Sequence, residues 1–476
     1  MANEYKTPGV YVEEITKFPP SIAAVETAIP AFIGYTEKAQ DGPDTIGEPF
    51  RITSLLEFEE HFGKAFPEKN AFAVSITDQT DTDDKLLSRK LEVTFTEASL
   101  SKYNLYYAVA QFFKNGGGPC YICSAGTHSE GGTIGKSDLE DQLGLLEEID
   151  EPTLIVFPEG LNLAAVGDYY DVINQSLGQC SDLGDRFTIF DIYPEDDDLR
   201  DDIDTMRGTI SSDLEKTKYG AAYYPSIKTY LPYELSGDIT VTHVVNKEGE
   251  GSPSDGPFEK IDDIKTGNPQ LYKEVITELQ KKRVKLPPSS SVAGVYARVD
   301  NDRGVWKAPA NVSLEGVKKL SVAITNDDND FMNVDPGSGK SVNAIRYFTG
   351  KGILVWGART LAGNDNEWRY VNVRRFFNYA EESIKKGTEH FVFEPNDANT
   401  WVKVKAMVGN FLTNQWRNGA LAGAKPDDAF FVKVGLGETM TADDILNGKM
   451  IIEIGMAVVR PAEFIILRFS HKMQQS

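Results

Sequence analysis

A glycine-rich stretch at residues 130–137, EGGTIGKS, resembles a phosphate-binding loop. It follows a short apolar run and precedes a helix-like segment, which is the setting such a loop requires. The pattern G-x-x-x-x-G-K-[ST], however, needs a glycine where this chain has Glu130, and a carboxylate there would repel phosphate. The remaining glycines and Lys136 still form a nest-like set. A nucleotide-binding α/β enzyme that uses loop 130–137 is therefore the alternative hypothesis for function.

The other candidate chemical groups give weaker signals. A second near match, GSGKS at residues 337–341, has Val334 where glycine is required and is expected to be a turn. Cys120 and Cys123 form a C-x-x-C within a strand-like run, with no second pair to complete a zinc site. The five histidines are scattered, and the acidic runs lack the ligand order of a calcium loop. We expect no metal, no cofactor and no enzymatic activity.

The elements that would position these residues alternate along the first half of the chain. Between about residues 28 and 226, brief apolar runs bounded by Pro, Gly or acidic residues are separated by helical patterns, which predicts an α/β layer. Residues 66–100 read as an exposed hairpin with a polar tip, and residues 246–268 as a loop. Both stretches are expected to be insertions on the layer, near residues 66–100 and 241–285.

From about residue 341 the pattern changes to α+β. Apolar residues with helical spacing from Val373 to Ile384 predict one helix, and a second helix is expected to begin near Asp397. Strand-like runs follow at residues 430–434, 450–459 and 464–469.

Length and charge set further limits. A chain of 476 residues exceeds the size of a single core, so two or more domains are expected. The net charge is -23, but residues 341–476 carry 17 Lys and Arg against 14 Asp and Glu, a net of +3, which leaves -26 on residues 1–340. The acidic body argues against nucleic acid as a partner. We expect neither a signal peptide nor direct membrane insertion, because no basic leader or long apolar run is present.

The two ends of the chain are apolar and strand-forming, where chain ends are usually polar and frayed. The N-terminal run is PGVYVEEI, and the C-terminal run is AEFIILRFS. Extended apolar ends favour β-augmentation, in which each arm completes the sheet of a neighbouring copy. An alternative remains open, in which both arms close the chain's own sheet. The candidate exchange residues are Val10, Tyr11, Val12, Ile15, Phe464, Ile465, Ile466, Leu467 and Phe469.

Five segments resemble the contractile tail sheath family, which includes sheaths of phage tails, R-type pyocins and extracellular contractile injection systems. They are YKTPGVYVEEI, TAIPAFIGYT, LPPSSSVAGVYARVDNDRGVWKAPAN, GKGILVWGARTL and NGKMIIEIGMAVVRPAEFIILRF. The resemblance implies a structural subunit of a helical sheath, stacked as hexameric rings around an inner tube protein and bounded by baseplate and terminal cap proteins. Contraction of the sheath would drive the tube through a target envelope.

The resemblance also implies an organisation. Residues 1–20 and 461–476 would be exchange arms, residues 21–340 an acidic outer α/β body, and residues 341–460 an α+β inner domain that faces the tube. A polar stripe on the second helix is the candidate tube contact, although it could equally be a solvated helix face. The stripe consists of Lys403, Asn410, Asn414 and Arg417.

The implied setting is bacterial. The chain would be made in the cytoplasm and assembled into a phage tail or a phage-tail-like particle, which stays in the cytoplasm or is released. A strand-exchange polymer that does not contract is a third hypothesis.

Overall fold

A computed structural model describes residues 22–39, 47–195 and 198–468. The chain divides into two compact units. The described part of the larger unit comprises residues 26–378 and 460–468, without the gaps above. The smaller unit comprises residues 22–25 and 379–459.

A nine-stranded sheet forms the centre of the larger unit, in the order β13-β16-β15-β8-β7-β6-β1-β5-β2. Its six central strands, from β15 to β5, are parallel, whereas β13, β16 and β2 pair antiparallel at the two edges. Strands β1 and β7 are buried along their whole length, which matches their nearly continuous apolar sequence. The strands are β1 (Pro30–Thr36), β2 (Phe50–Ile52), β5 (Cys120–Thr127), β6 (Leu154–Val156), β7 (Phe187–Asp191), β8 (Gly220–Tyr224), β13 (Val312–Ser313), β15 (Val342–Phe348) and β16 (Gly352–Val355).

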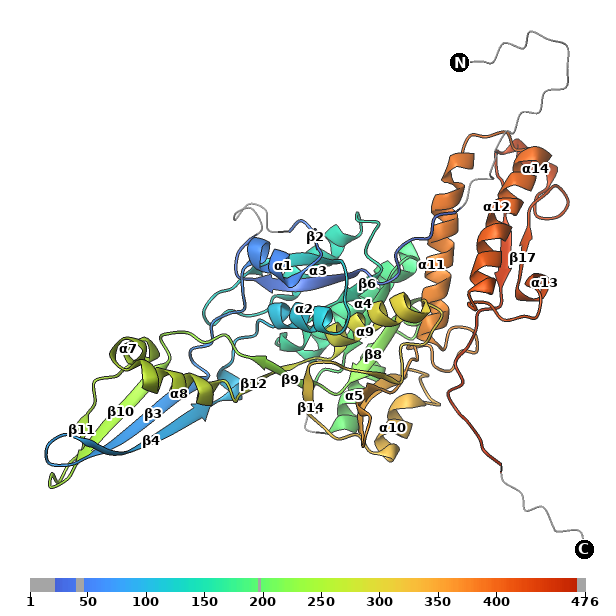
Figure 1. The fold of residues 1–476 in the computed structure, drawn as a ribbon. Coiled ribbons are helices and arrows are strands. Elements are labelled where there is room, and N and C mark those ends of the chain that lie inside the picture. The colour runs from blue at the N-terminus through green and yellow to red at the C-terminus, as the bar shows by residue number, and fades with distance from the viewer. Residues whose placement is uncertain (1–21, 40–46, 196–197, 469–476) are drawn as a thin grey trace, which may run out of the picture. The chain divides into compact units, whose positions relative to one another are not determined.

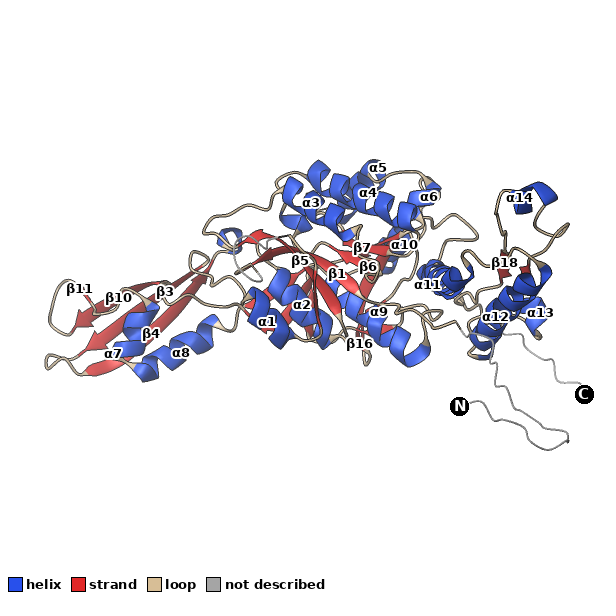
Figure 2. Ribbon diagram, turned by 90° about the horizontal axis from the view of Figure 1, so that it is seen from above, coloured by secondary structure: helices blue, strands red, loops and turns tan. Residues whose placement is uncertain are grey.

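Helices cover both faces of this sheet (Figure 2). One core lies between the sheet and α1 (Leu55–Phe62), α2 (Leu105–Lys114) and α9 (Ser289–Arg303). The other lies beneath α3 (Lys136–Leu146), α4 (Val166–Leu183) and α5 (Leu199–Thr209). The expected α/β layer is therefore present as a doubly wound sheet. Ser54 caps α1, since its Oγ accepts a hydrogen bond from the N–H of Glu57 at 3.2 Å, while the Glu57 carboxylate accepts from the N–H of Thr53 at 2.6 Å.

Two segments far apart in the sequence form one separate sheet, in the order β11-β10-β3-β4 (Figure 1). Strands β3 (Phe72–Thr80) and β4 (Leu86–Phe95) form the expected hairpin, and β10 (Thr240–Lys247) pairs parallel with β3. Helices α7 (Ile261–Gly267) and α8 (Pro269–Leu279) accompany this sheet, and β11 (Ser254–Asp255) is its other edge. The expectation of a loop over residues 246–268 was wrong in part, because α7 begins inside it.

The rest of the larger unit consists of short elements. A three-stranded antiparallel sheet has the order β12-β9-β14, and two short helices and two 3-10 turns connect larger elements of the described chain. These elements are β9 (Ile227–Pro232), β12 (Arg283–Leu286), β14 (Val317–Leu320), α6 (Leu214–Thr217), α10 (Asn326–Asn333) and the 3-10 turns Glu97–Ser99 and Gly160–Asn162.

The division between the units falls within helix α11 (Val371–Thr388), between Asn378 and Tyr379. This differs from the expected boundary near residue 341. The physical reason is that β15 pairs parallel with β8 at Ala222–Tyr224, so residues 342–348 belong to the large sheet. Sequence reasoning placed the boundary at the change of pattern and could not detect this long-range pairing.

The smaller unit is α+β, as expected for this part of the chain. After α11, helix α12 begins at its cap Asp397, whose side chain accepts from the N–H of Thr400 at 3.0 Å. Strands β17 and β18 pair antiparallel and make a two-stranded sheet. The remaining elements are α12 (Ala398–Arg417), α13 (Pro426–Ala429), β17 (Phe430–Lys433), α14 (Ala442–Leu446), β18 (Glu453–Met456) and the 3-10 turn Glu389–Phe391.

Candidate functional site

The glycine-rich loop 130–137 lies between β5 and α3, as a phosphate loop would, but its lysine is already compensated. Lys136 Nζ donates to Asp171 at 2.8 Å and lies 3.7 Å from carboxylate oxygens of both Glu140 and Asp168. Glu130 pairs with a lysine outside the loop, Lys69, at 3.5 Å. A phosphate would meet four carboxylates around this loop, so the arrangement disfavours an anionic ligand.

The place where a doubly wound sheet binds ligands is closed by the chain itself. The strand order reverses between β6 and β1, and such proteins bind ligands beyond the carboxyl ends of the strands at that point. Here Glu159 follows β6 and is fully buried. Its carboxylate accepts hydrogen bonds from the N–H groups of Tyr35 at 2.8 Å, Asn104 at 2.8 Å and Leu105 at 3.0 Å. Burial raises the pKa of Glu159 to about 7.

Glu159 thereby occupies the N-terminus of α2, which would otherwise be an anion site. The approach is so close that a Cβ added at Gly34 would lie 2.9 Å from a carboxylate oxygen of Glu159. The position that a nucleotide would need is filled by an internal side chain.

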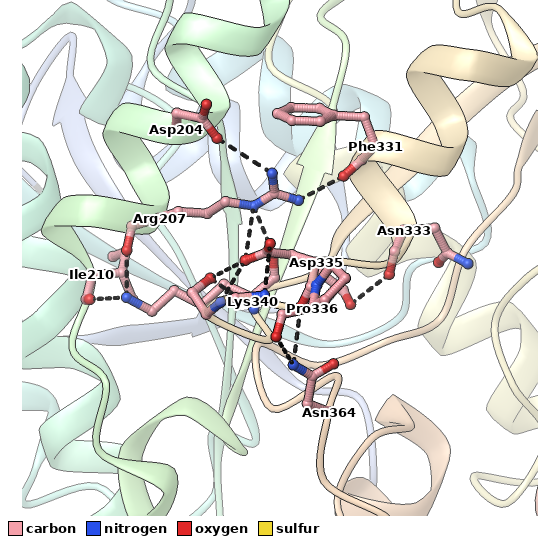
Figure 3. A network of polar contacts seen from close by, with 12 residues as sticks. Asp204, Arg207, Ile210, Phe331, Asn333, Asp335, Pro336, Lys340 and Asn364 are labelled. Carbon is pink, nitrogen blue, oxygen red and sulfur yellow. Dashed lines mark hydrogen bonds and ion pairs between the residues drawn. The ribbon is translucent and has the colours of Figure 1, made fainter.

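The second near match, residues 337–341, is a turn held by a buried network (Figure 3). Lys340 is only 2% exposed, and its ammonium donates to the backbone carbonyls of Arg207 and Ile210 at the end of α5. Arg207 in turn donates to the carbonyl of Phe331 at 2.7 Å. Asp335 accepts from the N–H of Ser338 at 2.8 Å, which closes the turn. Lys340 therefore caps a helix and is not available to a phosphate.

The cysteines are inert in this fold. Cys120, Cys123 and Cys180 are free and buried, and burial raises the pKa of all three thiols. Within residues 22–39, 47–195 and 198–468, no three His, Cys, Asp or Glu side chains are grouped to hold a metal ion. None of the helices there is long and apolar enough to cross a membrane.

The C-terminal segment carries the most unusual exposed surface. Phe464, Ile465, Ile466 and Leu467 are 69%, 79%, 77% and 72% exposed, and residues 461–468 belong to no strand. The open alternative required this end to join one of the chain's own sheets. Residues 461–468 do not do so. The expected strand is absent here because a strand needs a partner. Phe469 and the N-terminal candidates Val10, Tyr11, Val12 and Ile15 lie outside the described residues.

One residue at the start of this segment is firmly held. The carboxylate of Glu463 accepts from Arg359 Nη2 at 2.7 Å and Nε at 3.0 Å, from Asn333 Nδ2 at 2.6 Å and from the hydroxyl of Tyr370 at 3.1 Å. Sequence reasoning missed this contact. The available signal was a single acidic residue directly before a run of four apolar ones.

The two-stranded sheet offers free edges for pairing. Among the described residues, the outer edge of β17 has no strand partner, and Phe431 on this strand is 44% exposed. Residues 420–422 pair only beyond the end of β18, where Ala422 N–H donates to Ala457. A two-stranded sheet is marginally stable alone, and added strands would stabilise it.

The polar stripe predicted on α12 is exposed. Lys403, Asn410, Asn414 and Arg417 are all accessible to solvent. The opposite face is buried through Val404, Val408, Phe411 and Leu412. The structure thus places the four residues on one accessible helix face, and what this face contacts stays a prediction.

Comparison with known proteins decides the family. The model of the phage tail sheath C-terminal domain matches residues 363–472. The helical sheath of the anti-feeding prophage, solved in its contracted state, is 31% identical, with 98% of this chain and 100% of that chain covered and a TM-score of 0.64. The chain belongs to the contractile tail sheath family. It is a sheath subunit, and the family is one of structural proteins.

Other relatives agree with this assignment. The sheath of an extracellular contractile injection system, PVC, in its contracted state is 29% identical over 99% of both chains, with a TM-score of 0.63. The tail sheath protein of Burkholderia phage BcepMu is 31% identical over 145 residues, which are 29% of this chain and 30% of that protein. The chain spans about a fifth to less than a half of the length of the curated phage relatives it matches.

Proposed function

We propose that this sheath subunit polymerises through its own ends into stacked hexameric rings around an inner tube protein. Arms 1–20 and 461–476 would each add a strand to the sheet of a neighbouring copy. The observation that carries this proposal is the exposure of four consecutive large apolar residues, 464–467, in the isolated chain. Fully burying each such side chain contributes roughly 1.5–3 kcal/mol, so this segment needs a partner.

The β17–β18 sheet is the proposed acceptor. It has the free edge that β-augmentation requires, and main-chain hydrogen bonds would supply affinity while alternate side chains set the register. If the acceptor belongs to another copy, the contact is heterologous and repeats into rings or helices.

The smaller unit, with described residues 22–25 and 379–459, is the proposed inner domain, and the larger unit is the proposed outer body. The stripe of Lys403, Asn410, Asn414 and Arg417 is exposed and carries two positive charges, which would complement an acidic tube surface. The small sheet formed by the two insertions belongs to the proposed outer body.

Contraction requires two packings of the same subunits. The extended packing would be trapped kinetically, and small gains at many interfaces would be released together on contraction. The arms would stay paired in both packings and hold the lattice together while the tube is driven through a target envelope. Baseplate and terminal cap proteins would bound the sheath in a phage tail or a released particle made in the bacterial cytoplasm.

We further propose that the chain has no enzymatic activity. The sealed carboxyl edge at Glu159 and the paired Lys136 both count against nucleotide binding. Addition of Mg-ATP is expected to leave the thermal unfolding midpoint unchanged, whereas a nucleotide site would raise it.

Negative-stain microscopy of the purified chain tests the assembly proposal. The full chain is expected to form tubes, and a variant lacking residues 1–15 is expected to stay folded and soluble without forming them. Circular dichroism checks that the variant is folded. Normal tubes from the truncated chain would contradict arm exchange.

A further inference from the structure

We propose that Glu463 and Arg359 form a clamp that mounts the C-terminal arm on the larger unit and fixes the direction in which it leaves. This inference rests on the proposed exchange of that arm. The carboxylate of Glu463 is bound by three side chains, with the two shortest contacts at 2.6 Å from Asn333 and 2.7 Å from Arg359. The four residues that follow are exposed, so Glu463 is the point where the held chain becomes the free arm.

Arg359, which forms the ion pair with Glu463, is itself held in a fixed position. The Arg359 side chain is only 5% exposed, and its Nη1 donates to the carbonyl of Asn333 at 3.2 Å. Its backbone is fixed on both sides by the fully buried Asn343 of β15, which accepts from the Arg359 N–H at 2.7 Å and donates to its carbonyl at 2.8 Å. The guanidinium is therefore held at a fixed position relative to the large sheet.

The clamp also changes which unit carries the arm. The arm follows Val459, whose N–H donates to the carbonyl of Ala420 at 3.1 Å within the smaller unit. Without the clamp, Val459 of the smaller unit would be the last fixed residue before the arm. With it, the base of the arm is Glu463, bound to three residues of the larger unit.

Tyr370 adds a second consequence. It directly precedes α11, where the chain leaves the larger unit, and its hydroxyl donates to Glu463, where the chain has returned. One hydrogen bond thus joins the residue before the chain leaves the larger unit to a residue just after it re-enters that unit. Each arm residue beyond Glu463 adds at most ~3.3 Å of reach, so a fixed base limits which neighbour the arm can meet.

The alternative is an ion pair that only stabilises the fold. Glu463→Gln removes the charge with little change of shape, and Glu278→Gln is the matched control, because Glu278 pairs with Lys281 at 2.5 Å on the exposed surface of α8. Spin labels at Lys351→Cys and Ile465→Cys, both exposed in the larger unit, report where the arm begins. The three native cysteines are buried and will not take the label.

Electron–electron distance measurements on the soluble subunit give the first readout. We expect a narrow distribution in the parent and in Glu278→Gln, and a distribution at least twice as wide in Glu463→Gln. Because the volume explored by the arm grows with the cube of that width, its effective concentration at the acceptor falls about tenfold, and the initial rate of sheath assembly should fall by the same factor. An unchanged distance distribution or an unchanged rate would overturn the clamp.

Two further variants keep the outcomes separable. Tyr370→Phe removes one hydrogen bond and is expected to widen the distribution by less than Glu463→Gln does; if Glu463→Gln fails to fold, Tyr370→Phe decides alone. A chain ending at Glu463 tests the proposed function independently. If that truncated chain assembles normally, arm exchange is wrong; if it fails while Glu463→Gln assembles at the parent rate, only the clamp is wrong.

Discussion

The carboxylate of Asp191, at the end of β7, accepts a hydrogen bond from the backbone N–H of Ser289 at the start of α9, at 2.9 Å. The other carboxylate oxygen of Asp191 is buried without a hydrogen-bond partner in the part of the chain that the structure describes. Asp191 links the end of β7 to the start of α9, and Glu159, which follows β6, links that strand to the start of α2. Both side chains lie at the carboxyl edge of the sheet. Other doubly wound proteins bind ligands at this edge, whereas here both carboxylates accept hydrogen bonds from backbone N–H groups.

The buried carboxyl of Asp191 predicts an unusual pH dependence of the free energy of unfolding. Burial raises the pKa of Asp191 from 3.8 to about 7, so the folded chain binds this proton more tightly than the unfolded chain does. The stabilisation is fully present below pH 3.8 and is lost as pH rises through about 7. Asp191→Asn should therefore be more stabilising at pH 8 than at pH 5, by on the order of 3 kcal/mol. Urea unfolding at both pH values measures this, and an equal effect at both would contradict it.

Lys340 should be essential for the stability of the larger unit. Replacing it by alanine leaves the carbonyls of Arg207 and Ile210 buried without their donor, which we expect to cost about 3 kcal/mol. Lys351→Ala, at an exposed lysine eleven residues later, should stay within about 0.5 kcal/mol of the parent. Scanning calorimetry compares the two, and equal unfolding midpoints would show that the network in Figure 3 contributes little.

Ile465 and Ile466 separate strand addition from unspecific adhesion. Successive side chains of a strand point to opposite faces, so only one of Ile465→Asp and Ile466→Asp should block assembly. Both residues are largely exposed in the subunit, and neither change should affect its folding. Sedimentation of assembled sheaths measures the outcome. If both variants impair assembly equally, the arm makes a nonspecific hydrophobic contact and does not pair as a strand in a fixed register.

The α12 stripe can be tested with two lysines of the same helix. Lys403 and Lys405 are both exposed, but two residues correspond to about 200° around a helix, so they face different directions. Lys403→Glu, alone and with Arg417→Glu, should weaken co-assembly with the tube protein, most strongly at low salt. Lys405→Glu should co-assemble like the parent. Cryo-electron microscopy or pelleting of decorated tubes compares the variants, and similar behaviour of all three would indicate a solvated helix face.

Local patterns in the sequence predicted many of these elements. The apolar run at Phe187–Asp191, the polar tip between β3 and β4, and the cap at Asp397 each carry their signal within a few residues. The boundary at residue 378, by contrast, depends on the pairing of β15 with β8, more than a hundred residues apart. No local pattern specifies such a partner.

The sites divide in the same way. The apolar run at residues 464–467 predicted an exchange strand; these residues are exposed in the subunit, and their exchange stays a prediction. The composition of DNDRG at residues 300–304 favours a turn, but Asp300–Arg303 end helix α9, and Gly304 leaves it with a φ of 92°. The partners of Glu463 could not be foreseen, because Asn333, Arg359 and Tyr370 meet only in the folded chain.

The small sheet has a consequence for synthesis on the ribosome. Strands β3 and β4 emerge some 150 residues before β10, α7 and α8, which cover Val74 and Ile76. Until then the hairpin carries an uncovered apolar face and an open edge, as unfinished sheets do. A nascent chain from which β10, α7 and α8 have not yet emerged should therefore bind chaperones more strongly than one from which all three have emerged.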